Sequence, residues 1–231
     1  MPIYRIADLN VEVNPKFKIC RKRLESYAVK SNESGKTDIA ISVSDDEIRE
    51  RLRLSDNLSE QGAEDVLILS KFCNAVLDGF DGFFFHSSCL ELDGEGYVFS
   101  AVSGTGKSTH TALWRRHFGN RVTMINDDKP VIRKCDGKFY AYGTPWMGKA
   151  DIETNTKAPV KAVYILQRAE ENTAVRVLPS QVMKQLLEAT VIDVERSRME
   201  KLLELLDEFF KETPLFLLGC NMTAYNAANG G

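Results

Sequence analysis

The run Ala101–Thr109, which reads Ala-Val-Ser-Gly-Thr-Gly-Lys-Ser-Thr, constrains the fold of this chain more than any other feature. It continues the strand-like segment Tyr97–Val102 and leads into the helix-like segment Lys107–Phe118. Glycines in such a loop let successive backbone N–H groups point into one concavity, and the helix start adds its positive dipole end. The run therefore predicts an anion-binding loop within an α/β fold.

Each part of this loop has an expected role toward a nucleotide. Backbone N–H groups cradle the phosphates, Lys107 supplies a charge for the β- and γ-phosphates, and the Ser108 hydroxyl ligates magnesium. We expect ATP and Mg²⁺ as ligands, although GTP or pyrophosphate in place of ATP stays open, and a glycine-rich turn that binds nothing is the alternative. The expected nucleotide contacts are Ser103, Gly104, Thr105, Gly106, Lys107, Ser108 and Thr109.

Two adjacent acids follow the next apolar strand, Val122–Ile125. Asp127 and Asp128 repel each other unless a cation lies nearby, so with Ser108 they form the expected magnesium site. One of the two could also be the general base that takes the proton of an acceptor hydroxyl. Which acid is the base and which is the metal ligand stays open, and a solvated turn before Pro130 is the alternative.

His86 precedes Lys107 by 21 residues and, taken alone, is more typical of a structural histidine at a strand end. Taken with Lys107 and the acidic pair, the segment Phe85–Ser88 resembles the catalytic domain of HPr kinase/phosphorylase. The resemblance covers about residues 83–165. It implies a P-loop fold shared with phosphoenolpyruvate carboxykinases, and phosphoryl transfer in which His86 and Asp127 lie at the γ-phosphate. Lys107, which the loop motif places at the phosphates, completes the expected catalytic set.

The chain also departs from this family. Ser87 follows the histidine where glycine is common, Ala101 opens the loop in place of glycine, and the acidic pair comes a few residues later than usual. The downstream signature for docking HPr is not recognisable, so the substrate need not be HPr. The segment Gly143–Lys149 is similar to one in smaller relatives, where Trp146 could wall the substrate pocket and Lys149 could hold an acidic group. A packed tryptophan and a surface lysine are equally good interpretations.

The patterns predict an α/β fold with a mixed sheet, and the resemblance implies a P-loop kinase of the HPr kinase/phosphoenolpyruvate carboxykinase type. Residues 1–80 form a small α+β lead-in, and residues 81–231 form the nucleotide-binding body. A capping box at Ser44 and Glu47 predicts a helix to about Leu54, and apolar spacing predicts another over Glu64–Phe80. Phe83–Leu92 is expected to be one strand, and further strands and helices follow to about Leu218.

Bulk composition excludes several functions. The net charge of -3 gives no basic field for nucleic acid or acidic membranes, and no apolar run approaches the length of a membrane helix. Without a signal-like start we expect a cytoplasmic protein with neither nucleic-acid nor membrane partners. Its five cysteines are scattered and form no Cys-x-x-Cys pair. Self-association into a homo-oligomer is left open.

The leading functional hypothesis is therefore a magnesium-dependent kinase that transfers the γ-phosphate of ATP to a hydroxyl of a small molecule, peptide or protein. A carboxykinase-like enzyme is one alternative, but 231 residues are few for the extra groups it needs. A non-catalytic ATP-binding regulatory module is the other, and His86 together with a doubled acid argues against it.

Overall fold

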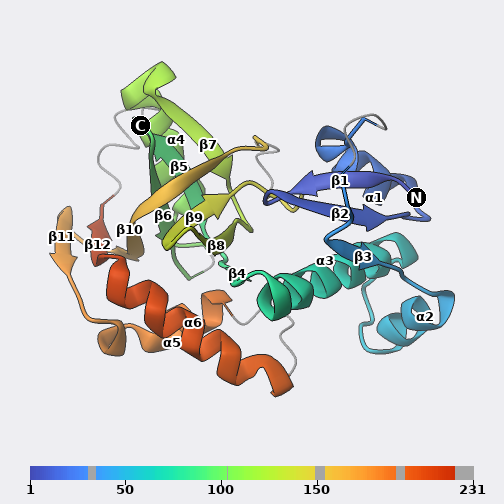
Figure 1. Ribbon diagram of the computed structural model, residues 1–231. Coiled ribbons are helices and arrows are strands. Elements are labelled where there is room, and N and C mark those ends of the chain that lie inside the picture. Colours follow the sequence, from blue (N-terminus) through green and yellow to red (C-terminus); the bar gives the residue numbers. More distant parts are fainter. Residues whose placement is uncertain (31–34, 103, 149–153, 191–195, 222–231) are drawn as a thin grey trace.

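The computed structural model describes residues 1–30, 35–102, 104–148, 154–190 and 196–221. Within these residues the chain forms a small sheet, a large curled mixed sheet and helices on both faces of the large sheet, which is an α/β arrangement (Figure 1). The strands are β1 (Ile3–Ile6), β2 (Leu9–Val13), β3 (Ile39–Ile41), β4 (Gly82–Phe84), β5 (Ser88–Leu92), β6 (Glu95–Ser100), β7 (Val122–Asn126), β8 (Val131–Cys135), β9 (Lys138–Tyr142), β10 (Lys157–Arg168), β11 (Thr173–Arg176) and β12 (Leu215–Cys220).

The α-helices match the periodic segments of the sequence in most places. They are α1 (Lys18–Leu24), α2 (Asp45–Arg53), α3 (Glu60–Gly79), α4 (Lys107–Phe118), α5 (Met183–Thr190) and α6 (Met199–Glu212). The predicted capping box is confirmed, because the Glu47 N–H donates to Ser44 Oγ at 3.2 Å and the Ser44 N–H donates to Glu47 Oε2 at 2.8 Å. The short charged helix α1 and the exposed strand β11 were not predicted, since neither has an apolar period.

The large sheet has the order β4-β8-β9-β10-β6-β5-β7, with β12 on β10 and β11 on β12. Strands β6, β10 and β12 are parallel neighbours, whereas β5 is antiparallel to both β6 and β7. Strand β7 therefore runs in the direction of β6. The carboxyl ends of β6, β7, β10 and β12 consequently lie along one edge of the sheet, which is where open α/β sheets bind ligands.

The prediction of one strand over residues 83–92 is wrong. Strand β4 pairs with β8 while β5 lies between β6 and β7, and the link between them is residues 85–87. In this link the N–H of His86 donates to Ala189 O at 2.7 Å and the N–H of Ser87 donates to Asp128 O at 3.0 Å. The polar residues His86, Ser87 and Ser88 interrupt the apolar run where the chain changes pairing partners.

Successive residues of a central strand point to opposite faces of the sheet and pack in different hydrophobic cores. On β6, Val98 packs in the core with α5 and α6, while its neighbour Phe99 packs in the core with Trp114 of α4. A further core lies under the small sheet and combines α3 with Trp146 and with Phe84 of the large sheet. The small sheet is thus packed against the large one through a shared core, and the proposed boundary near residue 80 stays a prediction.

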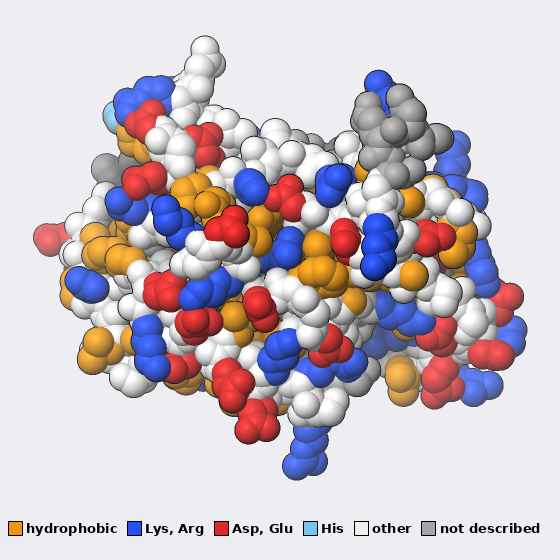
Figure 2. Space-filling view, viewed as in Figure 1, with side chains coloured by type: hydrophobic (Ala, Val, Ile, Leu, Met, Phe, Trp, Pro, Cys, Tyr) orange, Lys and Arg blue, Asp and Glu red, His pale blue; other side chains and the backbone are white. Residues whose placement is uncertain are grey.

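The surface has no single dominant charge on the face that Figure 2 shows, where acidic and basic side chains are interspersed. This agrees with the small net charge of the sequence. Among the described residues, no helix has the length and apolar character that crossing a membrane requires.

Candidate phosphate-binding site

The loop between β6 and α4 has the backbone that its glycines predict. Gly104 has φ of 79° and Gly106 has φ of 114°, and Gly106 is the N-cap of α4. A Cβ at either glycine would meet nothing within 4 Å, so the positive φ rather than crowding requires glycine there. Thr105 closes a turn by donating its N–H to Val102 O at 3.1 Å. Ser103 lies outside the described residues.

Lys107, the first residue of α4, turns its side chain back toward the end of β6. Its Nζ lies 3.5 Å from Ala101 O and 3.4 Å from Nε2 of His86. Burial lowers the pKa of Lys107, and the nearby Asp128 carboxylate partly offsets this effect. A partly desolvated ammonium at a helix start is well suited to bind an anion, because a phosphate would replace the hydration that burial removes.

His86 joins Lys107 to the acidic pair. Its Nε2 lies 3.1 Å from Asp128 Oδ1, and because a carboxylate only accepts, Nε2 carries the hydrogen of this bond. The other oxygen of Asp128, Oδ2, accepts from Lys129 Nζ at 2.5 Å. Burial by itself would raise the pKa of Asp128, but the hydrogen bonds from His86 and Lys129 outweigh it and bring the pKa to about 2. Asp128 is therefore a permanent anion beside Lys107.

Asp127 has different surroundings from its neighbour. It is 5% exposed, and its Oδ1 accepts the N–H of Gly148 at 2.6 Å. Asn126 fixes the turn, because its Oδ1 accepts the N–H groups of Asp128 at 2.9 Å and Lys129 at 2.7 Å. The acid in contact with His86 is Asp128, and the expectation that Asp127 and His86 meet at the γ-phosphate stays a prediction.

The segment that contains Gly148, residues 143–148, forms further hydrogen bonds with the turn that carries the two acids. Nδ2 of Asn126 donates to Thr144 O at 3.0 Å, and Oγ1 of Thr144 donates to Lys129 O at 2.7 Å. These bonds join residues 126–129 and 143–148 into one unit, which orients both carboxylates. Sequence reasoning noticed the second segment but not its role.

Trp146 belongs to the core rather than to a pocket wall. It is 3% exposed, its ring stacks on Phe72 at a centroid distance of 5.6 Å, and Phe84 meets it edge-on at 6.1 Å. Trp146 is therefore a packed core residue, and the expectation that it walls the substrate pocket is corrected. Lys149, the other residue assigned to substrate, lies outside the described residues.

The donors expected for magnesium are oxygen atoms, as this ion requires. Ser108 is exposed on the first turn of α4. It is next to Lys107, whose ammonium group interacts electrostatically with the Asp128 carboxylate. Within the described residues no three His, Cys, Asp or Glu side chains form a metal cluster. Magnesium is usually held by one or two carboxylates together with phosphate oxygens and water, so one hydroxyl and two acids fit it without such a cluster.

Arg168 is a site residue that sequence reasoning missed. It ends β10, the parallel neighbour of β6, and its Nη2 donates to Gly104 O at 3.0 Å. The signal was available in part, because a cation after a buried β-branched strand lies at the ligand-binding edge of a parallel sheet. Its contact with the loop depends on strand order, which the sequence does not display.

Comparison with known proteins adds little to this geometry. No family model matches the chain, and no curated protein matches it. Among solved structures, the Hpr(Ser) kinase/phosphatase from Coxiella burnetii is similar at 12% identity and a TM-score of 0.35, over 64% of this chain and 95% of that one. The functional proposal therefore rests on the site itself.

Proposed function

We propose that the chain is a magnesium-dependent P-loop kinase of the HPr kinase/phosphoenolpyruvate carboxykinase type, which transfers the γ-phosphate of ATP to a hydroxyl group. The observation that carries this proposal is the contact of Lys107 Nζ with His86 Nε2 at 3.4 Å, with Asp128 Oδ1 a further 3.1 Å from the same ring nitrogen. Three separate segments bring these groups to the mouth of a glycine-rich loop. A turn that binds nothing has no need of this arrangement.

The phosphates would bind where the loop N–H groups, the α4 dipole and Lys107 act together. Asp128 would keep the His86 ring oriented through Nε2, so that the ring lies beside the γ-phosphate. Ser108 and Asp128 would hold the magnesium ion, which neutralises phosphate charge when bound. Lys107, His86 and the N–H groups stabilise the charge that develops on the transferred group.

Asp127 is the proposed general base. The acceptor hydroxyl oxygen forms a bond to the γ-phosphorus, the bond from that phosphorus to the bridging oxygen breaks, ADP leaves with the electron pair, and the hydroxyl proton passes to Asp127. Asp128 is the poorer candidate, because a carboxyl with a pKa of about 2 is a weak base at neutral pH. Its fixed charge suits the ion and His86 instead.

The acceptor is proposed only as a hydroxyl of a small molecule, peptide or protein. We place the transfer chemistry in residues 81–231 and regard residues 1–80 as the α+β lead-in. The near-neutral surface favours neither nucleic acid nor membrane as a partner, and a cytoplasmic location is part of the same proposal.

The test is calorimetric binding of Mg-ATP, followed by incubation of the protein with γ-labelled ATP and separate metabolite and protein fractions. We expect binding, and label transfer to one fraction. Lys107→Ala should weaken binding at least tenfold, while Lys161→Ala, which removes an exposed partner of Glu95, should bind like the parent.

Equal affinity in the Lys107→Ala protein would overturn the nucleotide proposal. Binding without transfer would favour the regulatory module, and label recovered in phosphoenolpyruvate after incubation with oxaloacetate, with release of CO2, would favour the carboxykinase-like enzyme. The three outcomes are distinguished by where the label is recovered.

A further inference from the structure

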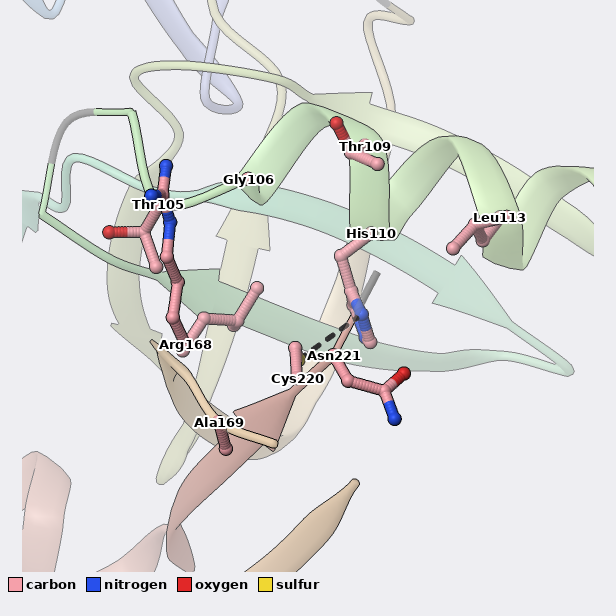
Figure 3. A pocket seen from close by; sticks show the side chains of 10 residues that line it. Thr105, Gly106, Thr109, His110, Leu113, Arg168, Ala169, Cys220 and Asn221 are labelled. Carbon is pink, nitrogen blue, oxygen red and sulfur yellow. Dashed lines mark hydrogen bonds between the residues drawn. The ribbon is translucent and has the colours of Figure 1, made fainter. Parts of the chain in front are cut away.

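A cavity of about 250 Å³ adjoins the phosphate loop (Figure 3). It lies on the side of β6 away from the acidic pair. Strand order defines the two sides, because the cavity is lined from β10 and β12, whereas the acids follow β7 beyond β5. The volume is slightly below the range of about 300–1,000 Å³ that pockets for drug-sized ligands occupy. The lining residues are Thr105, Gly106, Thr109, His110, Leu113, Leu166, Arg168, Ala169, Cys220 and Asn221.

The topology explains why a cavity forms here. Strands β6, β10 and β12 are parallel, so Arg168 and Cys220 end their strands at the edge from which the loop leaves β6. The helix α4 rises from the same edge, and Thr109 and Leu113 lie one turn apart on the side that faces the two strand ends. A crevice outside the carboxyl ends of parallel strands is the usual ligand position in open α/β sheets.

The cavity is connected to the phosphate loop through shared residues. Thr105 and Gly106 belong to both, and Arg168 donates from the cavity rim to Gly104 O at 3.0 Å. Figure 3 shows the Arg168 side chain reaching from β10 toward Thr105. A ligand whose anionic end occupies the loop would therefore have its next atoms beside this cavity.

The wall is mostly apolar and uncharged. Leu113, Leu166 and Ala169 supply apolar surface, and none of the described lining residues is acidic. His110 Nδ1 lies 3.9 Å from Cys220 Sγ, and burial lowers the pKa of this histidine and raises that of this thiol, so both are neutral at pH 7. Apolar walls with a few polar groups at the rim suit a flat heterocycle attached to a sugar.

We propose that this cavity binds the nucleoside, base and ribose together, of the nucleoside triphosphate whose phosphates the loop holds. The inference rests on the proposed function and adds the direction in which the bound nucleotide lies. The nucleoside lies against β10 and β12, the phosphate chain crosses the start of α4, and the γ-phosphate points toward His86 and Asp128. The two ends of the nucleotide are thereby assigned to opposite sides of β6.

The test fills the cavity without touching the loop. Ala169→Phe should weaken Mg-ATP binding at least tenfold while inorganic tripolyphosphate, which has no nucleoside, binds within twofold of the parent. Ala174→Phe, the same change on the exposed strand β11, should leave both affinities unchanged. Parental affinity for Mg-ATP in Ala169→Phe would overturn the inference, whereas failure of the parent to bind tripolyphosphate would contradict the phosphate loop itself.

A second measurement on the unmodified chain covers the case in which Ala169→Phe fails to fold. Cys220 lines the cavity, and its alkylation by N-ethylmaleimide can be followed by peptide mass spectrometry. Saturating Mg-ATP should slow Cys220 alkylation at least threefold, and saturating tripolyphosphate should not. Equal alkylation rates with the two ligands would place the nucleoside elsewhere.

Discussion

The backbone N–H of Gly148 donates to Oδ1 of Asp127 at 2.6 Å, and the glycine lies flat against that carboxylate. A Cβ on Gly148 would be 3.0 Å from Asp127 Oδ2, 3.2 Å from Cγ and 3.3 Å from Oδ1. A Cβ at this position would therefore crowd the carboxylate, and the N–H of Gly148 fixes the direction of the proposed base.

Gly148→Ala should displace the Asp127 carboxylate by a few tenths of an ångström and lower phosphoryl transfer at least tenfold, because proton transfer depends on position. Affinity for ATP should stay within twofold. The measurement is single-turnover transfer alongside calorimetry. Gly79→Ala is the matched control, since a Cβ there meets nothing within 4 Å. Equal losses in the two variants would contradict the positioning role.

Asp127→Asn should lower transfer by about a hundredfold or more, which is what the loss of a general base commonly costs. The asparagine keeps the shape and can still accept the Gly148 N–H, so ATP affinity should change little. Quench-flow with the identified acceptor measures the step directly. Full single-turnover activity would transfer the role of base to Asp128.

Ser108→Ala should raise the magnesium concentration needed for half-maximal transfer several-fold, because it removes one oxygen donor from the proposed ion site. Binding of magnesium-free nucleotide should stay within twofold. A magnesium titration of the transfer rate provides the comparison, with the exposed Ser180→Ala as control. A magnesium dependence identical to that of the parent would place the ion away from α4.

Asp128 should contribute to stability in a pH-dependent way. Its folded-state pKa of about 2 lies below the ordinary 3.8, so the stabilisation is present above about pH 4 and is lost as the pH falls toward 2. The shift corresponds to about 2 kcal/mol at pH 7, roughly half of which is lost by pH 3. Urea unfolding of the parent and Asp128→Asn from pH 7 to pH 3 should show this gap narrowing. A gap independent of pH would mean that His86 and Lys129 do not stabilise the charged form.

Trp146→Ala should lower the free energy of unfolding by about 3–5 kcal/mol, the usual cost of deleting a buried aromatic side chain. The exposed Leu178→Ala should change it by less than about 0.5 kcal/mol. Urea unfolding followed by far-UV circular dichroism measures both. A loss below about 1 kcal/mol for Trp146→Ala, combined with weaker acceptor binding, would restore the pocket role of this residue.

Local chemistry could be predicted from the sequence because it depends on neighbours along the chain. Gly104 and Gly106 have positive φ, α4 begins at Lys107, and Ser44 with Glu47 caps α2, all as the spacing indicates. Each feature involves residues only a few positions apart. Backbone freedom and capping bonds act over that range, so no knowledge of the remaining fold was needed.

The pairing of His86 with Asp128, by contrast, was decided by the tertiary structure. His86 precedes β5 and the acids follow β7, and the register between these strands shifts between Cys89 and Leu90. The acids lie in a bend after β7, where Asn126 Oδ1 accepts the N–H groups of Asp128 and Lys129, so this turn and the register together decide which acid meets the histidine. The sequence determined that two acids reach this edge of the sheet. The register of β5 on β7 and the turn at Asn126 bring Asp128 into contact with His86. The path of the chain after β9 places Gly148 against Asp127.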